Sequence, residues 1–173
     1  DPHAAKNKGN LLAAGNALCA GCHVAIVKSA SEAKFGHPPA QRNCLGCHDP
    51  HASGRSEFLL KKEVPALCAD CHQTDRPVFA KQHMNYPVAK ARCTSCHDPH
   101  GSGNPGILWA TVHPPVINKM CGQCHQDPAS PPPLSLKKRG YELCRGCHSS
   151  LVNETLSKNR VHWPAVDKLG CRN

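Results

Sequence analysis

The sequence is poor in the residues that usually build a protein core. Only three Phe, two Tyr and two Trp occur among 173 residues. No run of about 18 apolar residues is present, which argues against a transmembrane helix, and 16 Pro with 13 Gly argue against long helices or a large sheet. We therefore expect a mostly irregular fold with short α-helices and little or no sheet beyond a short hairpin.

Cysteine and histidine are abundant instead, with 13 of each. Twelve of the cysteines fall in six copies of Cys-x-x-Cys-His, the attachment signal for c-type haem. In this chemistry two thiols bond to one haem and the adjacent imidazole binds its iron as the proximal ligand. The six sets are Cys19, Cys22 and His23; Cys44, Cys47 and His48; Cys68, Cys71 and His72; Cys93, Cys96 and His97; Cys121, Cys124 and His125; and Cys144, Cys147 and His148. The sequence thus predicts six haem c groups.

Three other readings of these cysteines fit less well. Zinc sites group their ligands in fours and do not require a His after every second Cys. Thioredoxin-like chemistry uses one Cys-x-x-Cys on a βαβ unit, and no strand pattern accompanies these six. Disulfides within Cys-x-x-Cys would close loops too short to constrain the chain much.

The motifs form a repeat, because one of them recurs about every 25 residues along the chain. Two kinds alternate: after the motifs that begin at Cys44 and Cys93 the chain continues with Asp-Pro-His. The third pair is irregular, as if one motif of this kind were missing before Cys121. We predict a single elongated unit built of repeats, roughly 1–48, 49–97 and 98–173.

Both ends of the sequence look like parts of further repeats. Residues 1–3 are the same Asp-Pro-His triplet, and Cys171 follows Cys144 by about the length of one repeat, where a seventh motif would begin. The alternative for Cys171 is a lone thiol. We expect the given sequence to be a window onto a longer chain or a fragment of one, with part of a seventh haem site.

The segment 93–102, Cys-Thr-Ser-Cys-His-Asp-Pro-His-Gly-Ser, carries a resemblance to a known family. It resembles the doubled-CXXCH multihaem c-type cytochromes, which include the periplasmic decahaem subunits of porin–cytochrome conduits and related extracellular electron carriers. The resemblance extends over essentially the whole chain. It implies haems stacked in a row, iron held by two histidines, and electron transfer as the task.

Seven histidines outside the motifs are candidates for the distal iron ligands. They are His3, His37, His51, His83, His100, His113 and His162. Four of them stand a short distance before a Cys, and three stand in Asp-Pro-His, where Asp49 and Asp98 are expected to orient the second His through an Asx turn. Six irons need six further imidazoles, so one is surplus; His3 and His162 could each serve a haem outside the chain.

The apolar pattern predicts two motif-bearing helices, over residues 10–20 and 141–156, and residues 130–133 are expected to form an extended linker. With so few aromatic side chains, the porphyrins would supply the core. We therefore expect the chain to be unfolded without haem.

The formal net charge of +9 would by itself favour nucleic acid or an anionic membrane as a partner. Six haems with ionised propionates change this to roughly +3 oxidised and −3 reduced. The basic residues are then expected to pair with propionates, and no nucleic-acid partner is predicted.

These expectations favour an electron carrier and not an enzyme. If every iron has two His ligands, one-electron exchange is the available chemistry, at low potential and in periplasmic or extracellular respiration. Expected partners are redox proteins or other cytochromes, an outer-membrane porin, or copies of the chain in a homopolymer. The alternatives are a multihaem reductase of a small nitrogen or sulfur oxyanion with one five-coordinate haem, and a conductive filament subunit. Because haem is attached outside the cytoplasmic membrane, we expect a secreted bacterial or archaeal protein.

Overall fold

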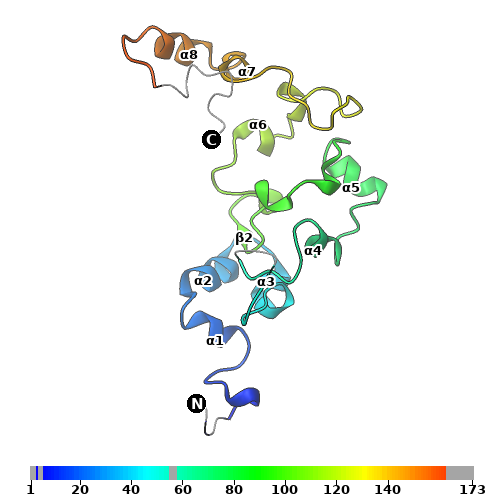
Figure 1. Cartoon of the computed structure of the whole chain (residues 1–173), viewed down its shortest axis with the longest axis vertical. Helices are drawn as coiled ribbons and strands as arrows, with labels where there is room; N and C mark the ends of the chain where they lie inside the picture. The colour runs from blue at the N-terminus through cyan, green and yellow to red at the C-terminus, as the bar shows by residue number, and fades with distance from the viewer. Residues whose placement is uncertain (1–2, 4–5, 55–57, 163–173) are drawn as a thin grey trace.

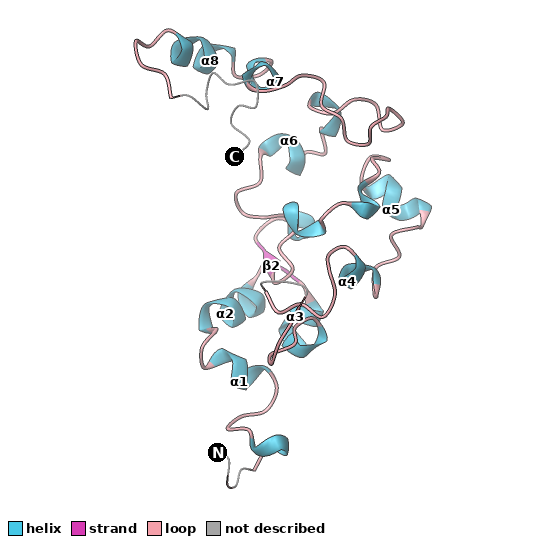
Figure 2. Ribbon diagram, viewed as in Figure 1, coloured by secondary structure: helices cyan, strands magenta, loops and turns pink. Residues whose placement is uncertain are grey.

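The computed structural model describes residues 3, 6–54 and 58–162. Short helices follow one another along the long axis of the molecule and are joined by turns and loops (Figures 1 and 2). The α-helices are α1 (Asn16–Ala20), α2 (Val24–Glu32), α3 (Pro38–Arg42), α4 (Ala66–Ala69), α5 (Pro77–Gln82), α6 (Pro114–Ile117), α7 (Tyr141–Arg145) and α8 (Ser149–Leu156). The 3-10 helices are η1 (Lys8–Asn10), η2 (Cys44–Gly46), η3 (Val88–Lys90), η4 (Cys93–Ser95), η5 (Pro105–Ile107) and η6 (Cys121–Gln123). The predicted fold class is confirmed.

The two helices expected from the apolar pattern are shorter than predicted. In the first, only Asn16–Ala20 is α-helical, because Gly15 adopts a left-handed backbone with φ of 53° and begins α1. The second is divided into α7 and α8 by the turn at residues 146–148. The glycine thus shortens the first helix, whereas the haem motif divides the second.

The extended linker predicted for residues 130–133 is wrong. These residues form bends and a turn, and the Ser135 amide donates to the Pro132 carbonyl. The Gln126 amide donates in turn to the Ser135 carbonyl at 2.8 Å. The segment therefore closes a loop that returns the chain to the motif at Cys121.

A two-stranded antiparallel sheet joins segments that are far apart in sequence. Strand β1 (Phe35–Gly36) pairs with β2 (Gly101–Ser102), with Gly36 opposite Gly101. Gly101 has φ of 106°, and a Cβ there would lie 2.9 Å from the Cβ of Ala33. Only glycine fits this position, and the close approach brings His37 next to the Asp-Pro-His turn that ends at His100.

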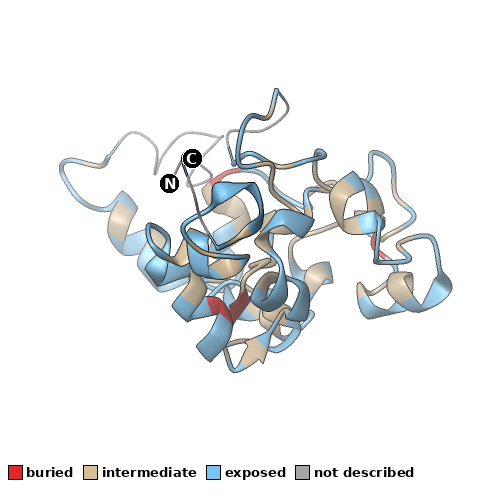
Figure 3. Ribbon diagram, turned by 90° about the horizontal axis from the view of Figure 1, so that it is seen from below, coloured by how far each residue is buried: buried red, intermediate tan, exposed pale blue. Residues whose placement is uncertain are grey.

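Very little of the described chain is buried by protein atoms (Figure 3). Among the described residues the buried apolar ones are Ala30 and Tyr86, 3% and 7% exposed, and no large side chain is completely buried. The accessible surface is 12883 Å², against roughly 8,200 Å² for a compact protein of 18.6 kDa. Side chains such as Leu12, Val24 and Leu151 are 60% or more exposed. The polypeptide alone therefore does not enclose a hydrophobic core.

No helix in the ranges that the structure describes has the length and apolar character of a membrane span.

Candidate haem sites

All six Cys-x-x-Cys-His motifs fold into the same backbone turn. In each, the amides of the second Cys and of the His donate to the carbonyl of the first Cys, at 3.1–3.2 Å and 2.8–3.0 Å. Residues three and four positions apart in such a turn lie on one side of it. Local hydrogen bonding thus places the two thiols and the imidazole of each motif together.

Three motifs, which we call the η-type motifs, begin in a 3-10 helix: η2 at Cys44, η4 at Cys93 and η6 at Cys121. In each, the His forms an isolated antiparallel bridge with a Leu further along the chain. The bridges are His48 with Leu60, His97 with Leu108 and His125 with Leu136. The bridge closes a loop that follows the motif, and it fixes the backbone of the proximal His.

The loop also fixes the imidazole ring of each η-type motif. Nδ1 of the His donates to a backbone carbonyl just before the bridging Leu: His48 to Phe58 at 2.8 Å, His97 to Gly106 at 2.7 Å and His125 to Leu134 at 2.8 Å. A carbonyl only accepts, so Nδ1 carries the hydrogen and Nε2 keeps its lone pair. This is the arrangement that orients a metal-binding histidine.

The other three motifs, the α-type motifs, lie in or at the end of a short α-helix: Cys19 in α1, Cys68 in α4 and Cys144 in α7. In the first and the last, the His stands at the start of the next helix, with His23 before α2 and His148 before α8. The two kinds of motif therefore share one turn but differ in the helix that contains it. The motif at Cys121 is η-type although Asp-Pro-His does not follow it, so the motif missing before it is an α-type motif and not one of the Asp-Pro-His kind.

Eight imidazoles form four pairs that face one another across similar distances. Ring centroids are separated by 6.2 Å for His37 and His72, 6.4 Å for His48 and His100, 6.2 Å for His83 and His97, and 6.1 Å for His113 and His148. Each pair joins one proximal His with one of the distal candidates. In three of the pairs the distal candidate adjoins a different motif in the sequence, whereas His83 faces the motif that directly follows it.

The common separation suits a metal ion between the rings. Two metal–nitrogen bonds of about 2 Å and two ring radii of roughly 1.1 Å place imidazole centroids about 6.3 Å apart. In the described residues no group of three or more His, Cys, Asp or Glu could hold a bare metal ion. Two axial imidazoles and two nearby thiols therefore fit haem c, whose porphyrin supplies the other four ligands of the iron.

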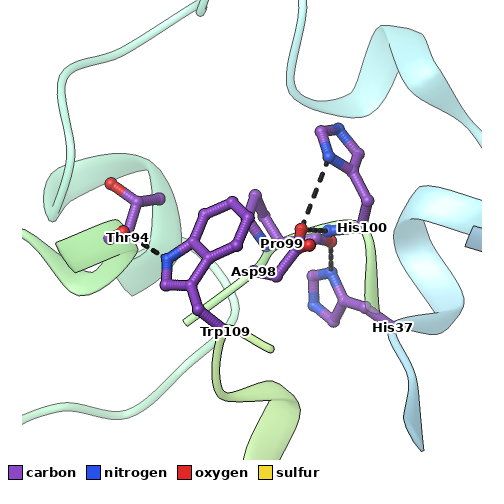
Figure 4. Close-up of polar contacts among 6 residues, drawn as sticks. All are labelled: His37, Thr94, Asp98, Pro99, His100 and Trp109. Carbon is purple, nitrogen blue, oxygen red and sulfur yellow. Dashed lines mark hydrogen bonds and ion pairs between the residues drawn. The ribbon is translucent and has the colours of Figure 1, made fainter. Parts of the chain in front are cut away.

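The Asp-Pro-His turn at 98–100 positions two of these rings (Figure 4). Asp98 Oδ1 accepts from the His100 amide at 2.9 Å, and His37 Nδ1 donates to the Pro99 carbonyl at 2.7 Å. The predicted Asx turns at Asp98 and Asp49 are confirmed, the latter through the His51 amide at 3.2 Å. The turn therefore orients distal candidates of two different pairs.

The surroundings of the His100 side chain favour its neutral form. Burial lowers its pKa below the ordinary value, which outweighs the raising effect of the Asp98 carboxylate, and the nearby His48 and His37 lower it further. Trp109 lines the same pocket as Asp98 and His100, and its Nε1 donates to the Thr94 carbonyl at 2.8 Å (Figure 4). A neutral imidazole is the form that can bind a metal.

Several of the predicted site residues do not belong to the four imidazole pairs. His125 contacts the ring of Tyr86, edge to face, with centroids 5.9 Å apart. The His51 side chain is 95% exposed, with Nδ1 3.9 Å from Asp49 Oδ1. His3 and His162 are not buried, and Cys171 lies outside the described residues.

Consecutive motifs lie beside one another in space from Cys19 to Cys121. The thiols of Cys44 and Cys19 lie close enough to interact, and so do those of Cys68 and Cys93. Burial, followed by the influence of Cys93, raises the pKa of the Cys68 thiol to about 11. Burial and the neighbouring Cys71 raise the pKa of Cys47, and burial and Cys121 raise that of Cys96.

A third Asx turn, at Asp127 after the motif at Cys121, is not predicted by the sequence analysis because one residue, Gln126, is inserted between the motif and the Asp-Pro pair. Asp127 Oδ1 accepts from the Ala129 amide at 3.0 Å, as Asp98 accepts from the His100 amide. Ala129 thus takes the place that a second His occupies in the other two turns. The Asp-Pro pair at 127–128, one position later than expected, is the sequence feature that indicates this.

The comparison with known families agrees with this repeat structure. The family described as "Doubled CXXCH motif" matches four segments that together cover most of the chain, at residues 1–28, 37–77, 85–112 and 113–153. Segments 37–77 and 113–153 each hold an η-type motif followed by an α-type motif, whereas 85–112 holds only the motif at Cys93. No curated protein matches the chain at a significant level. The chain belongs to the doubled CXXCH motif family and is a multihaem c-type cytochrome, which binds haem c for electron transfer.

Proposed function

We propose that the chain carries electrons through a row of six covalently attached haems, at least four of which have two histidine ligands. The four imidazole pairs carry this proposal, because their common separation of 6.1–6.4 Å suits an iron between the rings. The six identical motif turns support the count of six. Haem c, when bound, supplies an iron that takes up and releases one electron.

The chain's own residues would hold each group from both sides. The thiols of a motif form the thioether bonds, and the neighbouring His binds one axial position. His37, His100, His83 and His113 would bind the opposite position at the motifs of Cys68, Cys44, Cys93 and Cys144, respectively. Two imidazoles leave no axial position for a substrate, which favours an electron carrier over a reductase.

Contact between the motifs supports the row. The thiols are the points of attachment, and the thiols of consecutive motifs from Cys19 to Cys121 lie close enough to influence one another. Groups attached there would be neighbours, as electron transfer requires. Imidazole on both sides favours a lower potential than a Met/His pair, and haem c attachment favours an exported protein that exchanges electrons with other redox proteins.

The haem count is tested by the mass of the intact holoprotein. We expect it to exceed the mass of the polypeptide by six haem groups, with every motif cysteine unreactive toward alkylating reagents. A smaller excess, or a motif whose cysteines are alkylated, would contradict the count.

The ligation is tested by electron paramagnetic resonance (EPR) of the fully oxidised protein, integrated against a standard. We expect low-spin signals amounting to at least four haem equivalents. More than two equivalents of high-spin iron would overturn the assignment of the four pairs and would favour a reductase with open iron sites.

A further inference from the structure

The pair His83 and His97 differs from the other three in sequence and in geometry. Two repeat units, residues 37–77 and 113–153, are complete, because each holds an η-type motif followed by an α-type motif. In these units the His before the η-type motif faces the proximal His of the α-type motif: His37 faces His72, and His113 faces His148. The unit with His83 has no α-type motif, and His83 faces instead the η-type His97 of the motif that directly follows it.

The chain also has no histidine at the position that, by analogy with the pair His48 and His100, would face His97. The η-type His48 faces His100, the last residue of the next Asp-Pro-His turn. The corresponding position after His97 is Ala129, which keeps the turn but has no imidazole. His83 and His97 have therefore both lost their regular partners, and they face one another.

This pairing has crossed ring planes. The angle between the imidazole planes is 77° for His83 and His97, the largest of the four pairs. It is 42° for His113 and His148, which are tilted, and 8° and 21° for the two parallel pairs, His48 with His100 and His37 with His72. Two parallel imidazoles both donate π density to the same iron d orbital, and this separates that orbital in energy from the second d orbital of π symmetry. Crossed imidazoles donate to different orbitals, which stay close in energy.

Phe79 is the residue that holds the His83 ring in this orientation. It lies one helical turn earlier, on α5, and its ring packs on the imidazole with centroids 4.3 Å apart. The Phe79 carbonyl also accepts from His83 Nδ1 at 2.9 Å. The His97 plane is held independently by the Gly106 carbonyl.

We propose that Phe79 is a positioning residue that sets the His83 imidazole across that of His97, so that the iron between them is electronically distinct from those of the parallel pairs. This inference rests on the proposed ligation by imidazole pairs. It predicts that one haem in the middle of the row has the most anisotropic low-spin EPR signal. That iron also has a higher reduction potential than the parallel pairs, because parallel planes stabilise the ferric state more.

The test compares EPR spectra of the oxidised holoprotein and three variants. In the wild type we expect an EPR signal from one haem equivalent whose largest g value lies well above those of the parallel pairs. In a reductive titration this signal should be the first to disappear, because the haem that gives it is reduced at the highest potential. Phe79→Leu keeps the backbone carbonyl but removes the packed ring, and should shift that one signal to a smaller g value. Phe79→Tyr should retain it. Val78→Ala, at an exposed position of the same helix, should leave the spectrum unchanged.

The outcomes separate this inference from the function on which it rests. More than two equivalents of high-spin iron in the wild type would contradict the imidazole pairs themselves. Low-spin iron throughout, without a strongly anisotropic signal, would overturn the crossed geometry alone. An unchanged spectrum in Phe79→Leu, or conversion of one equivalent to high spin there, would show that Phe79 does not act by setting the ring plane.

Discussion

Replacing all twelve motif cysteines with serine should abolish the folded state. The described chain buries only Ala30 and Tyr86 among its apolar residues, which is far too little hydrophobic burial to offset about 1–2 kcal/mol of backbone entropy per residue. Without the porphyrins, the exposed apolar side chains have nothing to pack against. We expect small-angle scattering to give a radius of gyration approaching about 44 Å, the value for an unfolded chain of this length.

The matched control removes a single attachment site. Cys144→Ser with Cys147→Ser removes only the haem attached at α7, at one end of the row (Figure 1), whose opposite ligand would be His113. This double variant should bind one haem fewer and lose amide protection mainly around residues 141–156. A cooperative unfolding transition in the variant that lacks all twelve cysteines would contradict the view that the cofactors form the core.

The motif chemistry and the fold class could be predicted because they depend on neighbouring residues. A single tight turn brings Cys19, Cys22 and His23 together whatever the rest of the chain does, and the scarcity of aromatic residues excludes a conventional core. The Asx turns at Asp49 and Asp98 are local in the same way. The sequence therefore predicted the family and the irregular fold correctly.

The pairing of the imidazoles could not be predicted, because it depends on the path of the chain between distant residues. His48 and His100 belong to different repeats. The contact between Gly36 and Gly101, which brings His37 beside the turn that ends at His100, involves strands of only two residues. Such strands carry no recognisable pattern of alternation. The prediction of an extended linker at 130–133 is wrong for a related reason: the prolines there indicate a break in helix or strand, but not the direction in which the chain continues.

Replacing His37 with alanine should convert one haem from low spin to high spin. His37 faces His72, and its removal would leave the iron at the Cys68 motif with one imidazole and an open position. We expect one haem equivalent of high-spin EPR signal and the binding of one equivalent of carbon monoxide after reduction.

Two further variants make this result specific. His51→Ala removes a candidate histidine whose side chain is 95% exposed, so it should leave the number of low-spin haems unchanged. His37→Met keeps an axial ligand but exchanges imidazole for thioether, which should retain low-spin iron and raise the potential of one haem. If His37→Ala left every haem low-spin, another group would occupy that axial position and the pairing of His37 with His72 would be wrong. If His51→Ala produced the high-spin signal instead, the distal ligands would follow an order different from the one that the ring separations indicate.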